Sequence, residues 1–181
     1  LALFPGGFGT QDEAFECLTL CQTGKSAPMP LVLLDRPGGN YWHDWNDYIH
    51  RQLLGRGLVS PEDPEIYTIT DQIDVACEAI ASFYRVFHSC RYVGQRLVLR
   101  LNTELSDEGV EWLNDAFSDI VVKGRIEKSP PLPQEAQDAS IGVSRLIFHF
   151  NQRDLGRLYH LIREVNRLGI PREESQHPER K

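Results

Sequence analysis

The sequence predicts an α/β fold, in which a parallel sheet is followed by a small α+β unit. Two observations predict the parallel sheet. The early apolar run 31–34 is continuous, as in strands buried on both faces, and strand-like segments alternate with helix-like segments through the first half. A third observation marks the change of architecture. Residues 96–101 alternate in character, which is the period of a half-covered strand.

Each element of the first half has a local signal. We expect a strand ending near residue 4, a helix over 10–22, a strand over 31–34, a helix over 42–54, a strand over 66–70, and a long helix from Asp71 toward Cys90. Strands joined by helices imply right-handed crossovers and a Rossmann-like sheet. Ligands of such sheets bind at the carboxyl ends of the strands. The loops 5–10 and 37–41 both follow such strand ends.

The second half predicts a βαββα order. The expected elements are a strand over 96–101, a helix over 106–117, a strand over 120–128, a Pro-rich loop over 129–140, a strand over 145–150, and a helix over 154–168. We therefore predict a Rossmann-like nucleotide-binding portion over 1–92, an α+β extension over 93–170 and a frayed tail over 171–181. No internal repeat is evident in the sequence.

The glycine-rich stretch Pro5–Thr10 carries the chemistry. Gly6, Gly7 and Gly9 allow positive φ and leave their N–H groups uncovered, so an anion can approach them. Thr10 is predicted to be the N-cap of a helix whose N-terminal N–H groups and dipole point at the same place. A phosphate is the ligand that this arrangement favours.

The same spacing has a purely structural interpretation. Thr10 and Glu13 stand three residues apart, as in a capping box, where the Glu13 carboxylate would accept a hydrogen bond from the Thr10 N–H. Spacing alone does not separate capping from ligand binding.

The motif Pro5-Gly6-Gly7-Phe8-Gly9-Thr10-x-x-Glu13 resembles the PGGxGTxxE signature of the LOG (LONELY GUY) family, phosphoribohydrolases once labelled lysine-decarboxylase-like. Residues 35–42, 83–84 and 88–92 resemble the longer bacterial members. The chain would then be the C-terminal portion of such a member, because it begins at Leu1, its only methionine is Met29, and a family arginine upstream of the motif has no counterpart here. We expect negligible hydrolase activity from these residues alone.

The resemblance implies an enzyme that cleaves the N-glycosidic bond of AMP or a cytokinin ribotide, releasing free base and ribose 5-phosphate. Glu13 would be catalytic, and Gly6, Gly7, Gly9, Thr10 and Thr19 would bind phosphate or nucleotide. Thr19 has an alternative role, a hydrogen bond from its hydroxyl to the Phe15 carbonyl. The alternative function is a non-catalytic nucleotide or cofactor carrier, similar to molybdenum-cofactor carriers, because a glycine loop alone does not separate binding from catalysis.

Composition excludes several function classes. The formal charge of −7 gives no electrostatic footprint for nucleic acid or an anionic membrane, and no apolar run approaches the roughly 20 residues of a membrane span. The four cysteines lie in segments predicted to be helical and have no disulfide or zinc spacing. We therefore expect them to be reduced and the protein to be cytoplasmic. The family resemblance implies a homodimer.

No cofactor or metal is expected. None of the four lysines (Lys25, Lys123, Lys128 and Lys181) is a convincing Schiff-base candidate for pyridoxal phosphate. His43, Asp47 and His50 share one face of a predicted helix, but a polar face opposite an apolar one is what any surface helix needs.

Overall fold

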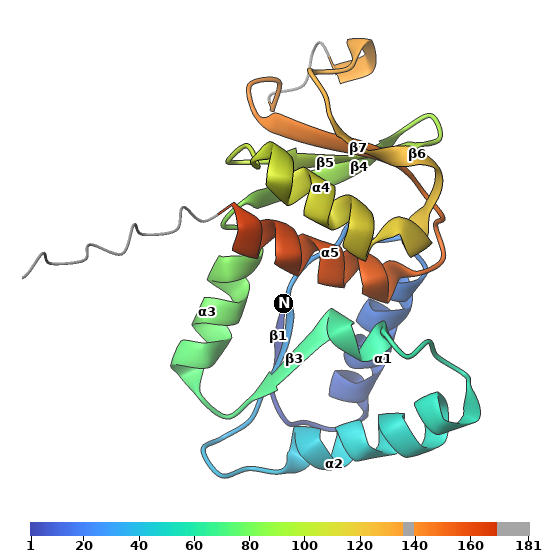
Figure 1. Cartoon of the computed structure of the whole chain (residues 1–181). Helices are drawn as coiled ribbons and strands as arrows, with labels where there is room; N and C mark the ends of the chain where they lie inside the picture. The colour runs from blue at the N-terminus through green and yellow to red at the C-terminus, as the bar shows by residue number, and fades with distance from the viewer. Residues whose placement is uncertain (136–139, 170–181) are drawn as a thin grey trace, which may run out of the picture.

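The computed structural model of the chain describes residues 1–135 and 140–169, which form two sheets (Figure 1). The first sheet is parallel and has the order β1-β2-β3, with β1 at Ala2–Leu3, β2 at Leu31–Leu34 and β3 at Tyr67–Thr70. The second is antiparallel and has the order β4-β5-β7-β6. The predicted fold class, a parallel sheet followed by an α+β unit, is confirmed.

Helices cover both faces of the parallel sheet, and all four residues of β2 are therefore buried. The leucines at 31 and 33 pack with Trp42 and Trp45 of α2 (Tyr41–Tyr48). Residues 32 and 34 point the other way and pack with Ala76 of α3 (Ile73–Phe83). The continuous apolar run of β2 therefore has the structural meaning that the sequence predicted.

Two predicted boundaries in the first half need small corrections. The helix expected over 42–54 is α2, which continues as a π-helical segment (Ile49–Leu53) and a 3-10 turn (Leu54–Arg56). The strand expected over 66–70 begins one residue later, because Asp63–Ile66 forms a 3-10 turn.

The long helix expected from Asp71 toward Cys90 is wrong. Helix α3 ends at Phe83, and β4 occupies Phe87–Val93, so Cys90 lies in a strand. The Asn166 Oδ1 atom of α5 accepts hydrogen bonds from the Val86 N–H at 2.8 Å and the Phe87 N–H at 2.9 Å. These buried contacts with a helix some 80 residues away fix the strand, and no local pattern reveals them.

The second half has the order ββαββα instead of the predicted βαββα, since β4 adds a strand before β5. Its elements are β5 (Arg96–Leu101), α4 (Asp107–Ala116), β6 (Val121–Lys128), β7 (Ser144–Phe150) and α5 (Leu155–Leu168). Ser106 caps α4, with its hydroxyl accepting a hydrogen bond from the Gly109 N–H at 3.1 Å. The tail 171–181 lies outside the described residues.

This half contains an internal repeat, contrary to the prediction from the sequence. Each repeat is a β-hairpin followed by a helix, and the second strands have similar sequences, Arg96–Asn102 (RLVLRLN) and Arg145–Asn151 (RLIFHFN). Aligning the two strands matches residue 97 with 146, 98 with 147 and 99 with 148. This alignment turns the pair 97–148 into the pair 99–146 and leaves Val98–Ile147 unchanged, so the register is symmetric about Val98–Ile147. The antiparallel sheet therefore has a pseudo-twofold axis between β5 and β7.

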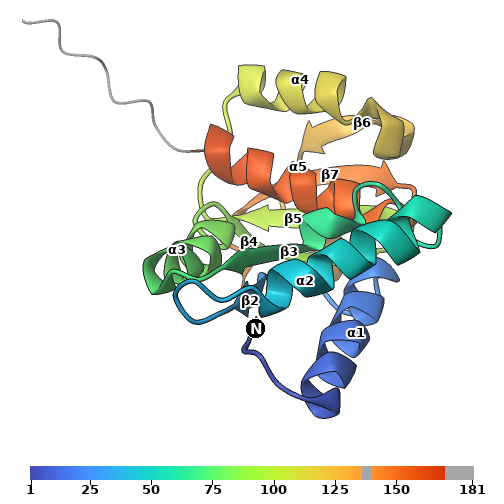
Figure 2. The same ribbon diagram turned by 90° about the horizontal axis from the view of Figure 1, so that it is seen from below.

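Helix α5 lies between the two sheets (Figures 1 and 2). One core cluster combines Cys21, Ile66 and Phe83 from the first half with the inward residues of β5 and β7 and with α5. The division at residue 92 stays a prediction, although it falls inside β4. The parallel strands themselves pack in clusters of their own, so this core cluster joins the two halves through α1 (Phe8–Gln22), α3 and α5 and not through the sheets directly.

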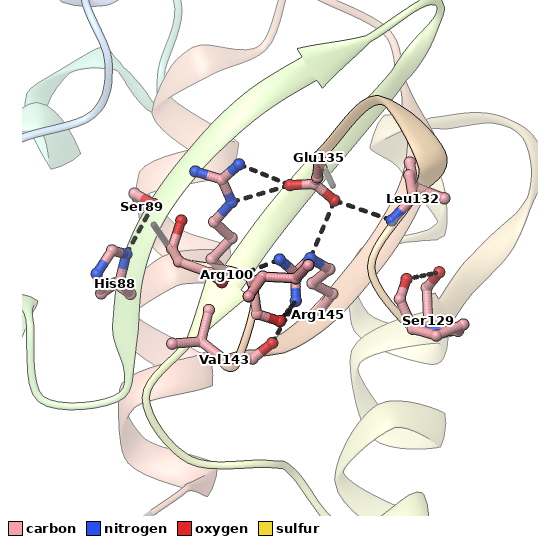
Figure 3. Close-up of polar contacts among 11 residues, drawn as sticks. His88, Ser89, Arg100, Ser129, Leu132, Glu135, Val143 and Arg145 are labelled. Carbon is pink, nitrogen blue, oxygen red and sulfur yellow. Dashed lines mark hydrogen bonds and ion pairs between the residues drawn. The ribbon is translucent and has the colours of Figure 1, made fainter. Parts of the chain in front are cut away.

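The outer face of the antiparallel sheet contains a buried ion-pair cluster (Figure 3). The alternating patterns of 96–101 and 145–150 predict that Arg100 and His149 share an outward face, either as solvated surface or as an oligomer contact. They do share that face, but Arg100 is buried with Arg145 beneath a loop that carries Glu135. One Glu135 oxygen accepts hydrogen bonds from the Arg100 Nε and Nη2 atoms at 3.0 and 2.6 Å, and the other accepts from the Arg145 Nε atom at 3.0 Å.

Two opposing effects act on the pKa of Glu135. Burial by itself raises the pKa, but hydrogen bonds from Arg100, the Leu132 N–H and Arg145 outweigh it and hold the pKa below its ordinary value. A lowered folded-state pKa means that this carboxylate contributes stability above the unfolded-state value of about 4.3, and that the contribution is lost as the pH falls through the folded-state pKa.

Replacing Glu135 tests this cluster. Glu135→Gln leaves two buried guanidinium groups without their carboxylate, so we expect the free energy of unfolding to fall by about 3–5 kcal/mol at pH 7. Urea denaturation between pH 3 and pH 7 should also show a smaller acid dependence for the variant. Asp115→Asn, at an exposed position of α4, is the control and should change stability by less than about 0.5 kcal/mol. A Glu135→Gln protein as stable as the control would contradict the ion-pair account.

Candidate functional site

A cleft of about 940 Å³ opens at the carboxyl ends of the parallel strands, where the fold class predicts a ligand. All three strands contribute, because parallel strands end at the same edge of the sheet. The lining residues are Phe4 and Pro5 after β1, residues 34–37 and 39–41 at and after the end of β2, and residues 71–74 after β3.

Asp35 organises the loop that follows β2. Its Oδ1 atom accepts a hydrogen bond from the Arg36 N–H at 2.7 Å, and its Oδ2 atom accepts one from the Tyr41 N–H at 2.9 Å. A Cβ atom at Gly39 would lie 2.2 Å from the Asp35 carboxylate, so only glycine fits this turn. The loop is thereby folded back onto the end of its own strand, and α2 begins at Tyr41.

The loops after β2 and β3 are also tied together. Gly38 has a φ of +71°, and its N–H donates a hydrogen bond to the Asp71 Oδ2 atom at 2.9 Å. The Gln72 N–H donates to the Thr70 hydroxyl oxygen at 3.1 Å. The first bond joins the two walls of the cleft, and the second holds the start of the loop after β3.

Tyr41 connects this wall to the glycine loop. Its hydroxyl donates a hydrogen bond to the Gly6 carbonyl at 2.7 Å and accepts one from the Gln11 Nε2 atom at 2.5 Å. The cleft and the start of α1 therefore form one connected region.

Helix α1 (Phe8–Gln22) begins two residues earlier than predicted, with Gly7 as its N-cap. Thr10 is thus not the N-cap, and no side-chain hydrogen bond caps this end of the helix. The Gln11 N–H donates to the Gly7 carbonyl at 3.2 Å, so the preceding N–H groups of Gly7, Phe8, Gly9 and Thr10 have no helical acceptor. This end of the helix has the properties of an anion site.

The motif glycines Gly6, Gly7 and Gly9 do not adopt positive φ, but Gly7 and Gly9 leave the space around their N–H groups open, as expected. A Cβ atom at Gly6 would lie 2.1 Å from the Thr10 hydroxyl oxygen, whereas one at Gly7 or Gly9 would meet nothing within 4 Å. Gly6 permits close packing of Thr10, and the other two leave open space around their N–H groups.

Glu13 is exposed on the second turn of α1. Within residues 1–135 and 140–169 its side chain makes no hydrogen bond or ion pair, so the capping box does not form. Glu13 is not among the residues that line the cleft. The structure places it one turn beyond the free N–H groups and leaves it unpaired there.

Thr19 lies away from the other predicted site residues. It follows Thr10 by nine residues, or about 14 Å along the helix axis. Its hydroxyl donates a hydrogen bond to the Phe15 carbonyl at 2.7 Å, as the alternative interpretation predicted. It lines a separate cavity of about 140 Å³ between α1, the π-helical segment 49–53 and the 3-10 turn 63–66.

The charge of the cleft limits where an anion can bind. Asp35, Asp71 and Asp74 line it, and Arg36 is its only basic side chain within the described part of the chain. Arg36 and the free N–H groups of α1 are therefore the groups at and beside the cleft that would attract a phosphate.

A second cavity of about 410 Å³ lies near the amino ends of β2 and β3, between α3 and α5. Its rim carries Arg85 and Arg163, but these pair with Glu78 and Glu65. The fold class gives no reason for a ligand at this end of the sheet.

Residues 1–80 match a family model described as "Possible lysine decarboxylase". The match covers the parallel sheet, the glycine loop and most of α3, and it ends before the antiparallel sheet. It supports the family that the motif resembles, while the resemblance to longer members stays a prediction. A comparison with curated proteins found no match.

None of the lysines in the part of the chain that the structure describes has the environment of a Schiff-base lysine, which a pyridoxal phosphate decarboxylase needs. Hydrogen bonds from Lys128 to Asp107 and then Glu104 raise the pKa of Lys128, whereas a Schiff-base lysine needs a lowered one. Lys25 and Lys123 are exposed, and Lys181 lies outside the described residues.

The described part of the chain contains no group of three or more His, Cys, Asp or Glu side chains placed to hold a metal ion, and His43, Asp47 and His50 are exposed. None of its helices has the length and apolar character to cross a membrane.

A pair of variants tests the packing of the glycine loop. Gly6→Ala forces a Cβ into the Thr10 side chain, so we expect the free energy of unfolding to fall by about 1–3 kcal/mol. Gly7→Ala places its methyl group in open space at φ −88° and should change it by less than about 0.5 kcal/mol. Chemical denaturation measures both, and equal losses would show that steric contact with Thr10 is not the reason for Gly6.

Proposed function

We propose that this protein is a nucleoside 5′-monophosphate phosphoribohydrolase that cleaves the N-glycosidic bond of AMP or a cytokinin ribotide. The observation that carries the proposal is the set of free N–H groups from Gly7 to Thr10, which open beside a cleft whose own walls are acidic. A 5′-phosphate at the start of α1 would leave the sugar and base to occupy the cleft. The family match to residues 1–80 supports the same reaction class.

The cleft offers suitable partners for the remainder of a nucleotide. Carboxylate and amide groups such as Asp71 and Asn40 would accept or donate hydrogen bonds to the ribose hydroxyls. Phe4 and Ile73 are 60% and 70% exposed at the cleft, and their apolar surfaces would contact the base. The volume of about 940 Å³ lies within the range of small-molecule sites.

Glu13 would supply the chemistry. When the bond between the ribose C1′ atom and the base nitrogen breaks, the leaving base takes the electron pair and the sugar becomes oxocarbenium-like. A carboxylate stabilises this positive charge and can accept a proton from the water that adds to C1′. The products are free base and ribose 5-phosphate. Glu13 forms no bond within the described residues that would have to break before it acts.

Glu13→Gln in the full-length protein tests the catalytic role. The structure gives Glu13 no capping bond, so stability should change by less than about 0.5 kcal/mol. The loss of the negative charge should lower kcat by roughly two orders of magnitude or more. Release of adenine from AMP, followed by chromatography, measures the activity. Glu16→Gln, at an exposed position one turn further along α1, should leave both properties unchanged.

Two outcomes would overturn the proposal. A Glu13→Gln protein with close to wild-type kcat would remove Glu13 from the mechanism. Tight binding of AMP without any release of adenine by the wild-type protein would favour the alternative function, a nucleotide or cofactor carrier.

We also propose that the working form is a homodimer, in which α1 contributes to the interface. Phe8 is 96% exposed and Phe15 is 37% exposed, and residues seven apart lie on the same side of a helix. Sedimentation at micromolar concentration should give a dimer, and Phe8→Ser should shift it toward the monomer. A wild-type monomer at that concentration would contradict the proposal.

A further inference from the structure

The outer face of the antiparallel sheet carries a second basic pair, Arg96 and His149. The β5–β7 register places residue 148 opposite 97, so its continuation places His149 opposite Arg96. Both side chains lie on the same face as Arg100 and Arg145. Residues an even number apart in a strand share a face, as 96 and 100 do in β5 and 145 and 149 do in β7, and Arg100 lies opposite Arg145. Both are half-buried.

The pseudo-twofold axis relates this pair to the buried ion-pair cluster. The axis passes through Val98–Ile147 and maps Arg100 onto His149 and Arg145 onto Arg96. The pair at one end of the face binds the Glu135 carboxylate through both guanidinium groups (Figure 3). The molecule therefore contains, at an equivalent position, an example of what such a cross-strand pair binds.

The pair Arg96–His149 is bound by no carboxylate in the part of the chain that the structure describes. Glu127, opposite Ile147 on β6, lies on the same face but makes no hydrogen bond or ion pair there. The side chains of Arg96, His149 and the neighbouring Lys123 make no hydrogen bond or ion pair within the part of the chain that the structure describes. Lys123 lies directly opposite His149 on β6, and Val93 lies opposite Arg96 on β4. Three basic groups thus form a row across the sheet beside an apolar residue.

We propose that Arg96, His149 and Lys123 bind an acidic side chain presented by another polypeptide. Glu135 reaches its arginines on a loop whose Leu132 packs on Val98 and Ile147 and whose Leu132 N–H also binds the carboxylate. A carboxylate on an open sheet face gains little from the ion pair alone, so its carrier must add contacts of this kind. This site lies on the other sheet from the cleft, and it does not depend on the proposed hydrolase.

The chain supplies the sequence of a suitable probe. We expect the peptide Pro-Pro-Leu-Pro-Gln-Glu, the sequence of residues 130–135 with blocked ends, to shift the NMR signals of the Arg96 Nε–H group and the His149 ring saturably. The same peptide ending in Gln should bind roughly tenfold more weakly, because it loses the charge-assisted hydrogen bonds.

Variants locate the binding. Arg96→Gln and, independently, His149→Gln should each weaken binding of the Glu peptide severalfold, whereas Arg56→Gln removes an exposed charge elsewhere and should not. Thermal unfolding shows whether each variant is folded. If Arg96→Gln does not fold, the binding measurement with His149→Gln decides the test. Equal binding of the two peptides, or unchanged binding by the folded site variants, would overturn the proposal.

Discussion

Burial of β2 on both faces is the constraint on which the cleft depends. A strand whose four side chains are all covered must lie in the middle of a sheet with helices on each side. Its parallel neighbours then end at the same edge, and the loops after β1, β2 and β3 meet there. Asp35 and Tyr41 fix one wall of the cleft there, because their hydrogen bonds connect the end of β2 to the glycine loop.

The parallel half depends on the antiparallel half in a way that the chain order does not reveal. Asn166 of α5 binds the backbone where β4 begins and donates to the Phe83 carbonyl at 2.8 Å, so one buried amide sets both the end of α3 and the start of β4. Tyr159 of the same helix contacts the backbone of Met29 just before β2. Through α5, the packing of the second half supports the strands that position the cleft.

Charge is distributed unevenly over the molecule despite its net charge of −7. The cleft walls are acidic, whereas the outer face of the antiparallel sheet gathers arginines, a histidine and a lysine. The repeat explains this second feature, since each copy contributes a basic residue at both ends of its central strand. At one end both arginines are buried and pair with Glu135, whereas the other end is only half-buried.

The sequence by itself determined the fold class, most of the elements, and the place of the candidate site at the carboxyl ends of the strands. These follow from hydrophobic period and from a motif of fixed spacing, both of which are local properties of the chain. Only the tertiary structure decided that α1 begins at Phe8, that Glu13 caps nothing, that Cys90 lies in a strand, and that Arg100 is buried. The last two depend on groups far apart in sequence, Asn166 for β4 and Glu135 for Arg100, which become partners only when distant segments pack together.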